Sequence, residues 1–125
     1  MLEFYAVLEK ILKRRNMYNE IDQMKEHIDK KRKPLEYYLA LLKQNEFQVK
    51  ETVNDEFSYR FVDAQSMFNH FLIKLAFLGS WMEFLPKKKQ NEIMVEAEGH
   101  LNSKAQTDGF ISLTVPFVLF DCEKV

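Results

Sequence analysis

The chain has 125 residues, of which 46% are hydrophobic and 30% charged, a balance typical of one folded globular domain rather than of a disordered segment. The formal net charge of −1 excludes a general electrostatic attraction to nucleic acid or to anionic membranes. Cys122 is the one cysteine, which excludes an internal disulfide and a thiolate metal cluster and favours a reducing, cytoplasmic location. The 14% aromatic content, with 11 Phe, predicts a Phe-rich core, with a Phe-lined cavity as the alternative.

The first third of the chain has the 3.6-residue periodicity of amphipathic helices. A helix at the start is predicted by the apolar positions Phe4, Leu8, Ile11 and Leu12. A second helix, over about residues 19–31, carries a narrow stripe that we expect to pack against the domain, with binding of a partner helix as the alternative: Met17, Ile21, Met24 and Ile28. Pro34 suits the first turn of a third helix, whose buried face would be formed by Leu35, Tyr38, Leu39 and Leu42.

After Asn45 the periodicity changes from 3.6 to 2, which predicts extended chain. Apolar and polar residues alternate over about 47–53, a half-buried strand. Asn54-Asp55-Glu56 is predicted to form a turn, and alternation resumes in a second extended segment over about 57–61.

The rest of the chain is predicted to be helical until its final strand. Asp63 is expected to cap a helix over about 64–78, whose wide apolar face should be largely covered and which Gly79 should end. A polar helix follows over about 88–105, with a thin apolar stripe of Ile93, Ala97 and Leu101. Residues 110–120 read as a long strand in which one face is shared by Ile111, Leu113, Val115, Phe117 and Leu119. Pro116 removes a ladder donor, so it should lie at an edge or a bulge.

The predicted fold is therefore a single α+β domain spanning residues 1–125. Its small antiparallel sheet would have two main strands, about 47–53 and 110–120. Two strands form a thin sheet to stand alone. No membrane span is expected, because the apolar stretch from Phe68 to Leu85 is interrupted by His70, Lys74 and Glu83.

Motifs for common chemistry are not found in the sequence. The three glycines are far apart and form no phosphate-binding or dinucleotide-binding loop, and the three histidines lie on different predicted helices. We assign no catalytic, metal-binding or cofactor-binding residue. The basic runs Lys30–Lys33 and Lys87–Lys89 are interpreted as solvated helix ends, so no nucleic-acid partner is expected.

One aromatic-rich region is a candidate substrate-binding site, with the residues Tyr59, Arg60, His70, Phe71 and Trp81. In one interpretation a core strand is followed by a core helix. In the other, the region lines an apolar cavity in which one cation and one imidazole orient a small-molecule substrate.

The stretch RKPLEYYLALLKQNEFQVKETVNDEFSYRFVDAQSMFNHFLIKLAFLGSW (residues 32–81), followed by ISLTVPFVLFDCEK (residues 111–124), resembles the C-terminal part of bacterial class I S-adenosylmethionine-dependent methyltransferases of the small-molecule type. The resemblance implies a partial Rossmann-like fold that contains the last two strands of a larger sheet. It also implies helices that shape substrate choice. The glycine-rich loop and the acidic residue that would hold S-adenosylmethionine are absent, so no cofactor is expected to bind this chain alone.

The resemblance thus implies the substrate-side portion of a methyltransferase, acting on an unknown small molecule and not competent as an enzyme alone. The alternative is a stand-alone, non-catalytic module that binds a ligand or another protein. Because the strand over 110–120 would lose a neighbour, we expect either a homodimer through its exposed edge or association with a missing Rossmann half.

Overall fold

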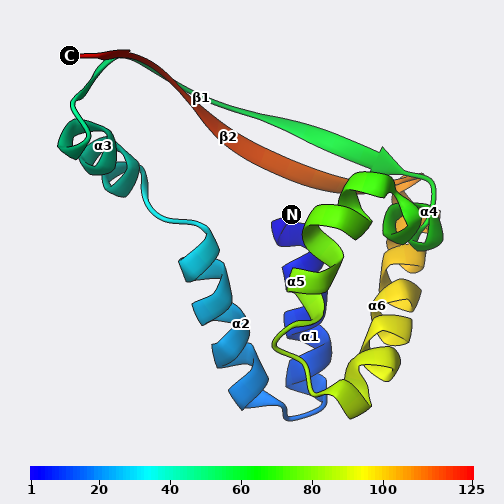
Figure 1. The fold of residues 1–125 in the computed structure, drawn as a ribbon. Coiled ribbons are helices and arrows are strands. Elements are labelled where there is room, and N and C mark those ends of the chain that lie inside the picture. Colours follow the sequence, from blue (N-terminus) through cyan, green and yellow to red (C-terminus); the bar gives the residue numbers. More distant parts are fainter.

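The computed structural model describes all 125 residues and is a mixed structure of helices and one antiparallel sheet (Figure 1). The elements in chain order are α1 (Leu2–Arg14), α2 (Tyr18–Lys31), α3 (Leu35–Gln44), β1 (Phe47–Phe61), α4 (Ala64–Asn69), the π-helix η1 (Ile73–Leu78), α5 (Gly79–Met82), α6 (Lys87–Asp108) and β2 (Ile111–Lys124). This composition confirms the predicted α+β class.

The helices α1, α2, α6 and the η1–α5 segment form a body around one apolar core (Figure 1). α1 contributes four side chains with no exposed surface, the predicted Phe4, Leu8, Ile11 and Leu12. Three residues of the α2 stripe are also buried and the fourth, Ile28, is partly buried, which confirms the prediction that this stripe packs against the domain. The stripe on α6 is buried as well. An ion pair links the end of α1 to α6, with Arg15 Nε 2.9 Å from Glu96 Oε2.

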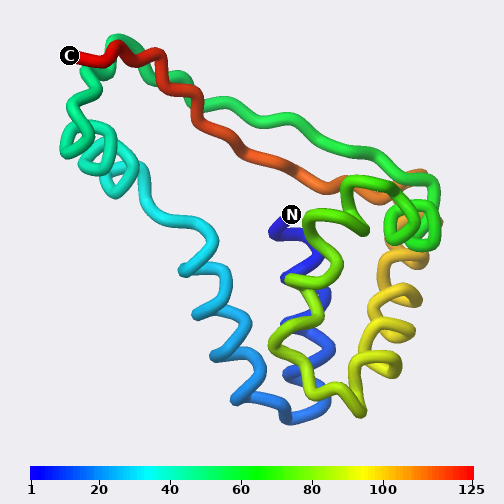
Figure 2. The backbone as a smooth tube through the Cα atoms, viewed as in Figure 1, coloured from blue at the N-terminus to red at the C-terminus, as the bar shows by residue number.

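β1 and β2 pair along their whole length in register from Phe47↔Lys124 to Phe61↔Ile111, although four helical segments separate them in sequence. A bulge at Lys50 interrupts the register once, between Val49 and Glu51. The inner end of this ribbon lies over the helical body. Its outer end projects away from the body and carries α3 and the C-terminus (Figure 2).

The turn predicted at Asn54-Asp55-Glu56 is wrong, because β1 continues through these residues. They pair with Val118, Phe117 and Pro116 of β2, so the ladder compensates for their weak strand propensity. Their polar side chains cost little desolvation free energy in the strand, because all three residues are exposed to solvent.

The single helix predicted over 64–78 is also wrong in detail. Asp63 does cap it, accepting a hydrogen bond from the Ser66 N–H at 2.7 Å. The helix is then interrupted at His70, whose ψ of 133° is extended, and helical structure resumes with η1. Gly79 does not end the helix but continues it with φ −60° and ψ −45°. Phe71 and Leu75 are 77% and 72% exposed, so the apolar face predicted over 64–78 is not fully covered.

α3 forms where it was predicted, but its predicted buried face is not buried. No residue of α3 is buried, because the helix packs against the adjoining end of β1 and not against the helical body. Pro116 lies in a two-stranded sheet, where every strand is an edge, as predicted.

Candidate functional site

The inner end of the ribbon brings two of the five candidate site residues together. The His70 ring lies 5.5 Å from the Tyr59 ring and 5.5 Å from the Phe61 ring, measured between centroids. Both aromatic residues lie on the face of β1 that packs on the body, since alternate strand residues share a face. His70 Nδ1 is buried and has no hydrogen-bond partner.

The other three candidate residues lie elsewhere. Arg60 lies on the opposite face of β1, with its guanidinium carbon 4.6 Å from the centroid of the Phe110 ring. Phe71 projects into solvent. Trp81 is 1% exposed and stacks on Phe4 with ring centroids 4.1 Å apart, so it belongs to the core. The five residues do not line one cavity, and a substrate-binding role for them stays a prediction.

The inner half of the β2 edge is capped by the start of α1. The Thr114 N–H donates to Glu3 Oε1 at 2.9 Å, and the Thr114 carbonyl accepts a hydrogen bond from the Met1 ammonium group. Glu3 Oε2 is 3.0 Å from the same nitrogen. Burial alone would raise the pKa of Glu3, but these hydrogen bonds outweigh it and lower the pKa to about 2.

The outer half of the ribbon and α3 form a surface that we call the arm, comprising residues 35–57 and 115–124. Large apolar side chains are exposed on both its helix and its strands: Tyr37, Tyr38, Leu41, Val53, Phe57, Phe117, Val118 and Leu119. Phe57 and Phe117 lie on one face, with ring centroids 6.2 Å apart. Several large apolar side chains exposed on one part of a soluble protein are typical of an interaction site.

Beneath the arm is a cleft of about 850 Å³ between the end of α2, the start of α3 and the middle of the ribbon. One rim is basic, with Lys31, Arg32 and Lys33, and the other is acidic, with Asp55 and Glu56. Its floor is apolar and includes Met1, Leu35, Phe77, Val115 and Phe120. This cleft could not be predicted from the sequence, in which the basic run on its rim is recognisable only as a helix end.

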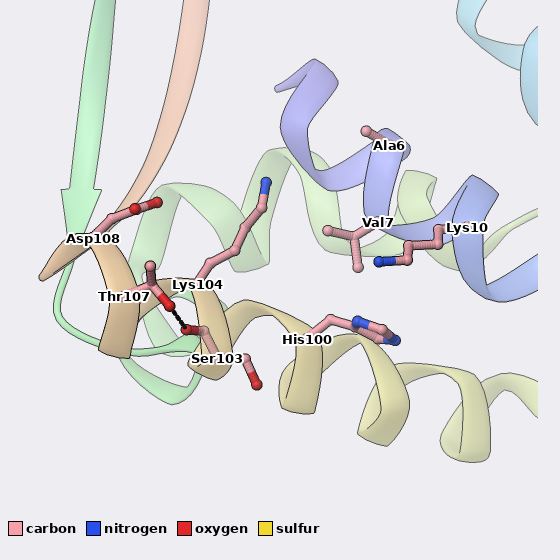
Figure 3. A pocket seen from close by; sticks show the side chains of 8 residues that line it. All are labelled: Ala6, Val7, Lys10, His100, Ser103, Lys104, Thr107 and Asp108. Atoms are coloured by element: carbon pink, nitrogen blue, oxygen red, sulfur yellow. Dashed lines mark hydrogen bonds between the residues drawn. The ribbon is translucent and has the colours of Figure 1, made fainter.

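A second, smaller depression of about 490 Å³ lies between α1 and α6 (Figure 3). Lys10 and His100 project from the two helices toward the space between them, and Lys104 and Asp108 extend the lining along α6. The Thr107 hydroxyl donates to the Ser103 carbonyl at 3.1 Å, so it is engaged within its own helix. The side chains that line this depression are mostly polar, and Lys10 and Lys104 are exposed, whereas about half of the residues that line the cleft under the arm are hydrophobic.

No cluster of three or more His, Cys, Asp or Glu side chains has the geometry to hold a metal ion. No helix has both the length and the apolar character needed to span a membrane. Comparison with protein-family models, with curated protein sequences and with solved structures yields no match.

Proposed function

We propose that this chain is a non-catalytic protein-binding module in which the arm and the cleft beneath it receive a partner polypeptide. The observation that carries the proposal is the contrast between the two halves of the molecule. Every residue of the one buried core lies outside the arm, whereas the arm buries no residue and leaves apolar side chains of α3 and of both strands exposed. We infer a cytoplasmic setting from the single free cysteine, Cys122.

Two features of the arm suit a polypeptide partner. The ribbon has only two strands, so each has one edge with backbone N–H and C=O groups to which an extended chain can add. The cleft offers an apolar floor between a basic and an acidic rim, and neither Arg32 nor Asp55 is in an ion pair within the chain. Such a surface supplies both apolar contact area and charge complementarity.

The proposal is tested by panning displayed random dodecapeptides against the purified chain. We expect strand-forming apolar peptides that bind with a micromolar dissociation constant and lose at least about tenfold in affinity to Phe57→Ser. The matched control is Val95→Ser, which removes an even more exposed apolar side chain from α6 in the body. Peptides that bind the wild type and both variants alike, or no enriched peptide at all, would refute the proposal.

A second candidate is the substrate-side portion of a methyltransferase that requires a Rossmann half for activity. One observation favours it: the two strands pair with each other antiparallel, as the resemblance implies for the last two strands of that fold. The candidate also implies a partner, because the cofactor-binding half would complete the sheet.

Isothermal titration with S-adenosylmethionine and S-adenosylhomocysteine addresses this candidate directly. No heat of binding is expected for the chain alone, and binding is expected after mixing with the matching cofactor-binding half. Micromolar binding by the chain alone would contradict the expectation, because the chain would then contain a complete cofactor site.

A further inference from the structure

The two outer edges of the ribbon differ in how they are protected. In an antiparallel strand the N–H and C=O of one residue point to the same edge, and successive residues alternate between edges. Thr114 points outward, since both its backbone groups bond to residues of α1. The outward positions of β2 are therefore Thr114, Pro116, Val118 and Phe120, and their register partners on β1 point outward on the other side.

The β1 edge has several structural features that hinder the addition of another strand. The outward N–H of Glu56 is already engaged by Asp55 Oδ1 at 2.8 Å. Lys50 forms the bulge, and the charged residue Glu51 follows it. Charged side chains and bulges on an edge strand are the common means of blocking edge-to-edge pairing.

The β2 edge is protected only on its inner half. α1 covers Thr114, and Pro116 has no N–H to donate. Beyond Pro116 the outward groups of Val118 and Phe120 have no partner within the chain. The side chains there are apolar on both faces of the strand, and Val118 and Leu119 are 41% and 53% exposed.

The total accessible surface of the chain is large enough to accommodate an interface of standard size. The chain has 8464 Å² of accessible surface, whereas a compact monomer of its mass is expected to have about 7,000 Å². The excess of about 1,400 Å² exceeds the roughly 800 Å² that each partner buries in an interface of standard size. The net charge of −1 means that two copies would repel each other only weakly.

From the asymmetry of the edges and this excess surface we infer that the partner of the arm is a second copy of the chain, joined by antiparallel pairing of the two β2 strands. This inference rests on the proposed binding function of the arm. A two-fold axis at Leu119 places Val118 opposite Phe120 of the partner subunit and makes a continuous four-stranded sheet. The same arrangement keeps the two Asp121 carboxylates apart, because each lies opposite Phe117 of the other copy.

The test is sedimentation equilibrium of the wild type and of edge variants at about 50 µM, a concentration at which micromolar dimers are mostly associated. The wild type is expected at twice its 15.0 kDa mass. Val118→Pro removes one outward donor and is expected to shift the chain to monomer. The matched control is Asn54→Pro, which removes the outward donor of the register partner on β1 and should leave the dimer intact.

A second pair of variants separates loss of pairing from loss of folding. Val118→Lys places a charge on the β2 edge and should weaken the dimer at least about tenfold, whereas Asn54→Lys should not. Circular dichroism confirms that each variant is folded. A monomeric wild type that still binds displayed peptides at Phe57 refutes the second copy and leaves the proposed function standing, while a monomer that binds none refutes both. A dimer lost equally in the Asn54 and Val118 variants refutes the assignment to the β2 edge.

Discussion

Glu3 joins the first turn of α1 to the inner half of β2. Its carboxylate is held ionised by the Thr114 N–H and by the nearby Met1 ammonium, although its side chain is only 31% exposed. A hydrogen bond to a charged group contributes about 1.5–3 kcal/mol, more than a neutral one, so this small contact matters for stability.

We predict that Glu3→Gln lowers the free energy of unfolding by about 2 kcal/mol at neutral pH. The pKa of Glu3 is about 2 in the folded chain against 4.5 unfolded, so between these values the unfolded state binds more protons and stability rises with pH. The contribution is fully present above pH 4.5 and is lost as the pH falls through about 2. Urea unfolding of both proteins across this range measures it, and a difference that does not shrink toward low pH would contradict the assignment.

At the scale of single elements, two glycines show opposite backbone requirements. Gly79 is helical, with φ −60°, and has open space where a Cβ would stand. Gly109 caps the end of α6 with φ 85°, a left-handed conformation that other residues adopt at a cost.

We predict that Gly79→Ala stabilises the chain by about 0.5–1 kcal/mol, because alanine loses less backbone freedom in a helix than glycine does. Gly109→Ala is the matched control and should destabilise by about 1 kcal/mol, because of its positive φ. Thermal unfolding of both variants checks the pair. Equal shifts of the two melting temperatures would show that the helix does not run through Gly79.

The segment that contains the π-helix η1 was predicted only in part from the sequence pattern. The apolar residues of 64–78 predicted a helix, and most of that segment is helical. Periodicity alone did not reveal the break at His70 or the wider turns of η1. The segment also packs against Phe4 and Tyr59, which lie outside it in sequence and which its own periodicity cannot reveal.

The molecule as a whole divides into a packed body and a projecting arm, and this division predicts uneven local stability. α3 has 10 residues, buries none of them and packs mainly against the adjoining strand. A helix of that length is marginal in isolation.

In hydrogen exchange we therefore expect the amides of Leu41–Gln44 in α3 to exchange at least about 100-fold faster than those of Leu8–Leu12 in α1. The measurement is made at a protein concentration low enough to keep the chain monomeric. The α6 amides around Leu101, which is 1% exposed, serve as the internal reference for the body. Equal protection of α3 and α1 would show that α3 is covered in solution.

The sequence by itself determined the α+β class, the positions of α1, α2, α3 and α6, the final strand and its shared apolar face, and the edge position of Pro116. Local periodicity and cap residues encode these features, because they depend on neighbours within one or two turns. Only the tertiary structure decided that β1 runs unbroken through Asn54–Glu56, that Trp81 is a core residue, and that Tyr59 and His70 meet while Phe71 does not join them. These outcomes depend on contacts between segments far apart in sequence, where cross-strand pairing and core packing outweigh local preference.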